Sequence, residues 1–317
     1  MTDRSSWVGA GLLLVFFTAF ISGISTFVNA YAVKGTSSDA FVTVRNLLVA
    51  AAFLPVALVA ARHLRAPKLR SVDWLRLGVI GLIGGAIPFL LFFHGLQMAT
   101  AAGGAVTASF AYRTLFLWAT VFAVFFLRER FHWRVVLGAG LLLGGSALLL
   151  SWNAPIWTDG TAYVLAATVL WAAEYTISKR TLRDLPSTTV ALGRMGFGGV
   201  FLAAYLALTA QWGAVAGFSG PDWVWVGISA AFLAAFVGTW YVGLKRVDLS
   251  IASAALVLGF PVTWILGVLV QGSPLTIGDA LGALAIVGGV ALVVGLAQFR
   301  DLRRFLQRAL RPTAAPT

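Results

Sequence analysis

The chain has 317 residues, of which 60% are apolar and only 11% are charged. Because soluble globular proteins carry about 25% charged residues, this composition excludes an ordinary soluble protein and indicates a chain whose solvent is lipid. The net charge of +12 would point to nucleic acid in a soluble chain, but we expect no nucleic-acid partner here, since the basic residues fall in loops between apolar segments.

Apolar runs long enough to cross about 30 Å of hydrocarbon follow one another along the chain. In the first half they lie near residues 8–31, 40–61, 75–97, 103–127 and 134–151. In the second half they lie near residues 160–178, 188–210, 223–244, 249–271 and 278–299. We therefore predict an all-α integral membrane protein with ten transmembrane helices, which leaves only short connections and no room for a soluble catalytic domain.

The second half of the sequence repeats the first. Asn29, near the end of the first run, is matched by Glu174, and Leu137-Gly138-Ala139 in the fifth run is matched by Leu281-Gly282-Ala283 in the tenth. Five spans in each copy would turn the second copy upside down, so we expect two inverted repeats around a central cavity. The expected units are a first repeat at 1–153, a second, inverted repeat at 154–299 and a basic amphipathic cytoplasmic tail at 300–317.

Lysine and arginine fall almost entirely on one side of the predicted membrane. If the N-terminus is inside, all but four of the 23 basic residues lie in inner segments. Lys34 would be outside, and Arg45, Arg113 and Arg194 lie within helices. Because cytoplasmic segments of membrane proteins carry such an excess, we expect a multi-pass protein of the cell (inner or plasma) membrane with both termini in the cytoplasm.

Several short motifs occur in an order that is shared by the two halves. The first run ends Asn29-Ala30-Tyr31-Ala32-Val33-Lys34, the second opens Phe41-Val42-Thr43-Val44-Arg45-Asn46, and the fourth ends Phe126-Leu127-Arg128-Glu129-Arg130. In the second half, the matching residues are Trp171, Lys179, Arg194 and Pro261. The chain thus resembles, over nearly its whole length, the EamA-type module of the drug/metabolite transporter superfamily. This resemblance implies ten helices, a central cavity between two inverted halves, and movement of small organic solutes, often outward.

Two positions depart from the family pattern. The fourth span usually carries a proline where this chain has Arg113, which aligns with Pro261 in the second half. The acidic residue expected after the ninth span is also missing, because Gly272-Ser273-Pro274-Leu275 stands where the first half has Arg128-Glu129-Arg130. The first departure puts the usual bend of span four in doubt and places a charge there instead.

Arg113 lies near the middle of the fourth run, where an arginine costs at least about 3 kcal/mol unless it faces water or a partner. It should therefore face the cavity. There its guanidinium would anchor a substrate carboxylate or phosphate, or it would form a structural pair with a carboxylate or with helix carbonyls. Its neighbour Tyr112 and the matching Phe260 would add an apolar wall suited to amphipathic solutes.

Glu174 is a carboxylate within the sixth run, and Trp171 lies three residues earlier on the same helical face. We expect both residues to contribute to substrate binding. Glu174 would also be able to couple transport to protons, whereas pairing with Arg113 would keep it charged, and a position at the membrane interface is the alternative to both. His94, near the outer end of the third run, is a second coupling candidate or else an interfacial hydrogen-bonding residue.

A polar stripe runs along the first predicted helix, where Thr18, Ser22, Ser25 and Asn29 share one face. The stripe either lines the transport path or forms hydrogen bonds between helices. We favour Asn29 and Ser25 as residues that line the path, and we add Ser109 from the fourth run as a substrate-binding candidate.

Four further residues have a more structural interpretation. Arg45 and Arg194 occupy matching positions in the second and seventh runs, close to a membrane face. We expect them to snorkel to that face or to cap the ends of neighbouring helices. Pro88 in the third run and Pro261 in the ninth remove backbone hydrogen bonds, so each is predicted to be a hinge or a static kink.

These features predict a secondary transporter of small organic metabolites that works by alternating access. Amino acids or related carboxylated and amphipathic solutes are the expected substrates, and export is expected only from the family resemblance. The alternatives are a permease for phosphorylated or lipid-linked solutes, which would need more than one buried cation, and a membrane sensor that does not transport.

The sequence does not indicate an enzyme. Cysteine is absent, and the three histidines, His63, His94 and His132, are scattered. A membrane enzyme would need paired carboxylates, a metal cluster or an activated nucleophile. We therefore expect no cofactor and no metal site, a small-molecule substrate and the lipid bilayer as partners, and a monomer or weak homodimer.

Overall fold

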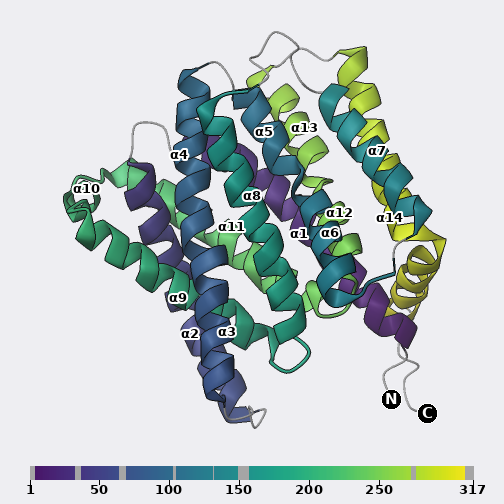
Figure 1. The fold of residues 1–317 in the computed structure, drawn as a ribbon, viewed down its shortest axis with the longest axis horizontal. Coiled ribbons are helices and arrows are strands. Elements are labelled where there is room, and N and C mark those ends of the chain that lie inside the picture. The colour runs from purple at the N-terminus through teal and green to yellow at the C-terminus, as the bar shows by residue number, and fades with distance from the viewer. Residues whose placement is uncertain are drawn as a thin grey trace.

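The structure is a computed structural model that describes residues 4–32, 37–63, 69–102, 105–130, 132–148, 157–272 and 276–310. Every regular element within these ranges is a helix, and the helices pack into one bundle (Figure 1). The first half contains α1 (Arg4–Ala32), α2 (Ser38–His63), α3 (Ser71–Ile80), η1 (Gly81–Ala86), α4 (Ile87–Ala101), α5 (Ala105–Arg113), α6 (Leu115–Leu127) and α7 (Trp133–Leu148). The second half contains α8 (Asp159–Thr181), α9 (Ser187–Leu208), α10 (Trp212–Ala216), α11 (Gly220–Leu244), α12 (Leu249–Leu256), α13 (Gly259–Gln271) and α14 (Ile277–Ala309).

Eight of the described helical stretches are long and apolar enough to cross a membrane. Three of the eight consist of more than one helix. One is formed by α3, η1 and α4, which follow one another without interruption, and the other two are formed by α5 with α6 and by α12 with α13, each pair separated by a short break. The predicted fifth and sixth spans fall outside the eight, since α7 has only 16 described residues and α8, with its hydroxyl-bearing and charged residues, is less apolar than the other long helices. Length and composition in the structure therefore support eight of the ten predicted spans.

Two spans break in corresponding regions of the two halves. α5 ends at Arg113, and Thr114 closes a tight turn before α6 begins. The backbone N–H of Thr114 donates to the carbonyl of Ala111 at 3.2 Å, and its hydroxyl donates to the same oxygen at 2.7 Å. α12 and α13 are likewise separated by a short break just before Pro261. Span four is therefore interrupted at Thr114, although it lacks the proline of the family pattern.

The third span changes its helical winding halfway along its length. η1 is a π-helix, in which the N–H of Ile87 donates to the carbonyl of Leu82 five residues earlier. Pro88 follows at once and has no N–H to donate to the carbonyl of Gly84, four residues earlier. The Gly84 carbonyl is therefore left for side chains of other helices. The absence of a side chain on Gly84 is also required, because a Cβ there would collide with the side chain of Glu174 on α8.

A carboxylate ties the end of α6 to the start of α12. Glu129, just after α6, accepts hydrogen bonds from the backbone N–H groups of Leu249 at 2.6 Å and Ser250 at 3.1 Å. It also accepts one from the Ser250 hydroxyl at 2.7 Å. A carboxylate in this position satisfies free N–H groups and interacts favourably with the helix dipole. The contact joins the two halves of the chain at one end of the bundle.

The two ends of the described chain lie side by side. α14 bends at Gly295, whose φ of 75° interrupts the helix, and its last turns fold back toward the start of α1 (Figure 1). Arg308 donates to the hydroxyl of Ser6 at 3.2 Å, and the rings of Phe16 and Phe299 stack 6.2 Å apart. The predicted basic tail therefore begins as the last turns of α14, and its final residues, 311–317, lie outside the described ranges.

Candidate functional site

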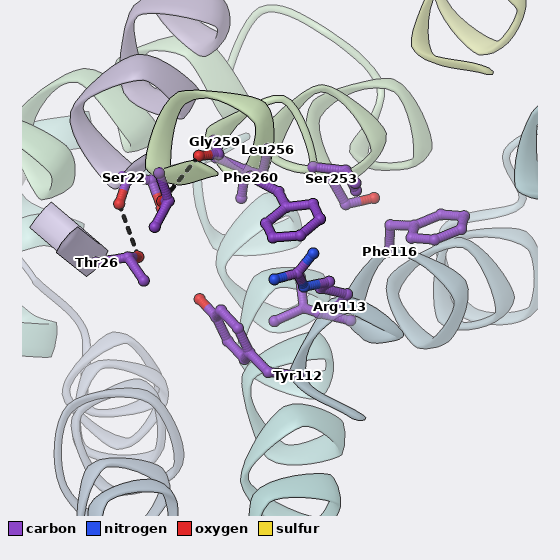
Figure 2. A pocket seen from close by; sticks show the side chains of 12 residues that line it. Ser22, Thr26, Tyr112, Arg113, Phe116, Ser253, Leu256, Gly259 and Phe260 are labelled. Carbon is purple, nitrogen blue, oxygen red and sulfur yellow. Dashed lines mark hydrogen bonds between the residues drawn. The ribbon is translucent and has the colours of Figure 1, made fainter. Parts of the chain in front are cut away.

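A cavity of about 90 Å³ lies where the two broken helices meet (Figure 2). Its walls come from α1, from α5 and α6, and from α12 and α13, so both halves of the chain contribute. The lining residues are Ser22, Thr26, Tyr112, Arg113, Leu115, Phe116, Ser253, Leu256, Val257, Gly259, Phe260 and Thr263. Interrupted helices in the interior of a membrane bundle typically form the binding site for a solute.

Arg113 is the charged residue of this cavity. Its guanidinium carbon lies 2.8 Å from the centre of the Phe260 ring, and Figure 2 shows the guanidinium directly against that ring with Tyr112 nearby. Nη1 of Arg113 is buried and has no hydrogen-bond partner among the described residues. None of the ion pairs in that part of the chain includes Arg113. The side chain therefore offers free N–H donors, which a carboxylate or a phosphate accepts well.

Tyr112 connects the cavity to a cluster of aromatic rings. Its ring lies 5.6 Å from that of Trp171 on α8 and 5.2 Å from that of Phe92 on α4. The ring of Phe89 lies 5.3 Å from that of Trp171. Edge-to-face contacts of this kind restrict the orientation of each ring. Trp171 thus supports Tyr112 beside the cavity but does not line the cavity itself.

Glu174 lies at the centre of a buried polar network. Its side chain has no exposed surface, and its Oε1 accepts hydrogen bonds from the hydroxyls of Ser178 at 2.5 Å and Tyr241 at 2.7 Å. Its Oε2 lies 3.8 Å from Nε of Arg194 on α9. The cation that pairs with Glu174 is therefore Arg194 and not Arg113. The full burial of Glu174 also removes it from any interface with headgroup water.

The free carbonyl of Gly84 links this network to the third span. Nε1 of Trp171 donates to it at 3.1 Å, and Nη2 of Arg194 donates to it at 3.2 Å. Side chains from α8 and α9 thus supply the hydrogen bonds that Pro88 cannot make. Pro88 was predicted to be a hinge or a static kink. In the structure it leaves the Gly84 carbonyl available as an acceptor for Trp171 and Arg194.

Arg45 and Arg194 are both buried, each with 2% of its surface exposed. Nε of Arg45 donates to Oδ1 of Asn46 at 3.3 Å, and the Asn46 amide donates to the carbonyl of Gly85 at 3.0 Å. The prediction that the two arginines snorkel to a membrane face is wrong, because both side chains are buried in the region where α9 packs on α2 and η1. Sequence reasoning therefore missed Arg194 as the partner of Glu174, although its position inside a span was a signal.

The polar stripe of α1 divides between two roles. Asn29 accepts a hydrogen bond from the hydroxyl of Ser229 on α11 at 2.6 Å and donates to Ser25 on its own helix at 3.2 Å. Neither Asn29 nor Ser25 lines the cavity, and α1 contributes Ser22 and Thr26 to it instead. The interhelical hydrogen bond is thus the role that the structure gives to Asn29.

The remaining predicted residues lie apart from the network. His94 is exposed on α4, and its ring lies 5.6 Å from that of Tyr163. Ser109 belongs to α5, but its side chain lies outside what the structure describes. Pro261 follows Phe260 in α13. No group of three or more potential metal ligands occurs among the described residues.

Comparison with known protein families identifies the family to which this chain belongs. The model described as "EamA-like transporter family" matches the chain twice, over residues 9–151 and 159–295. The chain belongs to the EamA-like transporter family. The first match begins in α1 and extends beyond α7, and the second begins with α8 and ends at the bend of α14. The EamA membership and the apolar helices together make this a multi-pass membrane protein that transports small solutes.

The fold of this EamA chain also occurs in a solved structure. A crystal structure titled "Crystal structure of protein" matches with a TM-score of 0.72 over 91% of this chain and 98% of that chain. The two sequences are 21% identical, so the likeness establishes the fold alone. None of the curated proteins compared with the chain matches it.

Proposed function

We propose that this EamA-family protein is a secondary transporter that exports amino acids or related small, carboxylated and amphipathic metabolites by alternating access. The observation that supports this most directly is the buried Nη1 of Arg113, which has no partner among the described residues. It lies in a cavity between two broken helices. A solute carboxylate would complete its hydrogen bonds and balance its charge. Export rather than import follows the direction that is common in the family.

Ten spans in two inverted repeats, 1–153 and 154–299, would explain why both halves build one cavity. α7 and α8 would supply the fifth and sixth spans of this arrangement. An even number of spans returns the chain to the side on which it began, which agrees with the contact between Arg308 and Ser6. We place that side in the cytoplasm, across the cell (inner or plasma) membrane, because the inner segments carry the basic residues.

The size and charge of the cavity favour a small carboxylated solute. A volume of about 90 Å³ is small for a lipid-linked molecule. Arg113 is the one cation among the described residues of its lining, whereas a doubly charged phosphate would call for a second. Tyr112, Phe116 and Phe260 would hold the apolar part of the solute.

The interruptions of the helices provide places at which a movement can open the cavity to one side of the membrane or to the other. The breaks before α6 and α13 lie in two spans that line the cavity, and the π-helix before Pro88 lies in the span that holds the polar network. Rocking of one repeat against the other would be absorbed there. A proton on Glu174 would cancel its attraction to Arg194, so Glu174 is the candidate for proton coupling, and facilitated diffusion is the alternative.

Uptake into liposomes that contain the purified protein tests the proposal. Labelled amino acids, the corresponding amines and phosphorylated solutes would be compared, with and without a pH gradient. We expect amino acids to be transported by the wild type and by the control Arg303→Gln, which changes an exposed arginine on the last turns of α14. Arg113→Gln should transport them much more slowly. Failure of the folded protein to transport any small solute would contradict transport, and a preference for phosphorylated solutes would support the permease instead.

A further inference from the structure

Arg45 and Arg194 form a pair of buried cations away from the cavity. They occupy matching positions in α2 and α9, which pack against each other. Their guanidinium carbons lie 4.9 Å and 5.9 Å from the centre of the same ring, that of Phe89. Neither arginine lines the cavity around Arg113. Two positive charges from the two halves of the chain therefore meet beside the third span.

Several donors of this pair have no acceptor at hydrogen-bond geometry among the described residues. Nη2 of Arg45 and both Nε and Nη1 of Arg194 are buried without a hydrogen-bond partner in the described part of the chain. The distance of 3.8 Å between Nε of Arg194 and Oε2 of Glu174 is too long for a hydrogen bond. Buried donors in native proteins almost always have a partner, so a group of unpartnered donors can serve as a site for a ligand that accepts hydrogen bonds.

The charges around the pair do not cancel. Among the described residues, Glu174 is the one carboxylate within ion-pair distance of either arginine. The other groups of the network are uncharged, namely the hydroxyls of Ser178 and Tyr241 and the amide of Asn46. Two guanidinium groups against one carboxylate leave one positive charge in the interior of the bundle. Such a charge is costly in a membrane protein unless an anion compensates it.

We propose that Arg45 and Arg194 bind a small monovalent anion between them, either chloride or a small carboxylate. The anion accepts hydrogen bonds from Nη2 of Arg45 and from the free N–H groups of Arg194, and it neutralises the excess charge. Glu174 competes with it, because both negative groups approach the guanidinium of Arg194. This site is separate from the cavity, so it does not depend on whether Arg113 binds a substrate.

Thermal unfolding of the purified protein in a neutral detergent tests this site. Sodium chloride and sodium acetate are each titrated against sodium gluconate, whose anion is bulky, at constant ionic strength. We expect the Tm of the wild type to rise saturably by roughly 2–4 °C with a small anion. A rise with acetate alone identifies a carboxylate as the ligand, and a rise with chloride identifies an inorganic anion. A Tm that is the same in all three salts overturns the proposal.

Three variants locate the effect. Arg45→Gln removes one ligand but keeps the pair of Arg194 and Glu174, and it should lose the rise in Tm. Arg303→Gln removes an exposed arginine elsewhere and should keep the rise. Glu174→Gln removes the competing carboxylate and should lower the anion concentration at half effect by roughly tenfold or more. An equal rise in Tm in Arg45→Gln and wild type overturns the proposal. An unchanged anion concentration at half effect in Glu174→Gln also overturns it. This second variant keeps the test decisive if Arg45→Gln does not fold.

Discussion

The guanidinium of Arg113 lies over the ring of Phe260, with 2.8 Å between the guanidinium carbon and the centre of the ring. Arg113 ends α5 in the first half of the chain, and Phe260 lies in the first turn of α13 in the second half. The contact therefore joins the two EamA repeats at the wall of the cavity. It orients the cation without neutralising it, because an aromatic face attracts a cation but supplies no carboxylate.

Replacing Phe260 with leucine should weaken substrate binding. Phe260→Leu keeps an apolar side chain but removes the aromatic face, and a cation–π contact contributes roughly 0.5–2 kcal/mol. We expect the KM for a carboxylated substrate in liposomes to rise about two- to thirtyfold. Phe125→Leu, at a position with 75% of its surface exposed, is the matched control and should leave KM unchanged. An unchanged KM in Phe260→Leu would show that the contact between Arg113 and Phe260 does not contribute to substrate binding.

Removing the charge of Glu174 should destabilise the protein. Glu174→Gln leaves Arg194 buried opposite a neutral amide, and breaking a buried ion pair costs roughly 3–5 kcal/mol. We expect a clearly lower Tm in detergent when the buffer contains only gluconate as the anion. The double variant Glu174→Gln/Arg194→Gln should recover part of this loss, because it leaves neither charge alone. Additive effects of the two single substitutions would show that the pair at 3.8 Å is not coupled.

Restoring a backbone donor at position 88 should slow the transport cycle. The N–H of alanine in Pro88→Ala would compete with Trp171 and Arg194 for the Gly84 carbonyl and would favour a straight helix. We expect the maximal transport rate to fall severalfold, while substrate affinity stays close to that of the wild type. Pro55→Ala changes an exposed proline inside α2 and serves as the control. Wild-type rates in Pro88→Ala would identify a static kink.

The N-terminal cap of α12 should contribute measurably to stability. Glu129→Ala removes three hydrogen bonds to Leu249 and Ser250, and loss of a helix cap costs roughly 0.5–2 kcal/mol. We expect a lower Tm for Glu129→Ala and no change for Arg130→Ala, which alters the exposed residue beside it. Equal Tm values for the two variants would mean that backbone contacts hold α12 without the cap.

The sequence predicted the helices well because a lipid solvent demands long apolar runs, whatever their neighbours are. It also placed Arg113 at the cavity, since an arginine in mid-membrane has few other places to face. The break at Thr114 was harder to predict. It depends on a hydroxyl that bonds the carbonyl of Ala111, and a threonine does this in only some helices.

The polar network could not be predicted because its members depend on packing between distant segments. Arg194 was expected at a membrane face on the basis of its distance from the end of a span. The packing of α9 on η1 buries it instead, and it reaches the Gly84 carbonyl that Pro88 leaves free. Asn29 was matched to Glu174 by the repeat, yet its partner is Ser229 on α11, which sequence spacing does not reveal.

A comparison of binding affinities tests most directly whether Arg113 binds the carboxylate of the substrate. The Kd of the purified protein for a transported amino acid would be measured beside the Kd for the corresponding amide, which lacks the negative charge. We predict that the wild type and Arg303→Gln bind the amino acid at least about tenfold more tightly than the amide, and that Arg113→Gln binds the two equally. If Arg113→Gln keeps the wild-type ratio and only lowers Tm, then Arg113 is a structural residue and the account of recognition is contradicted.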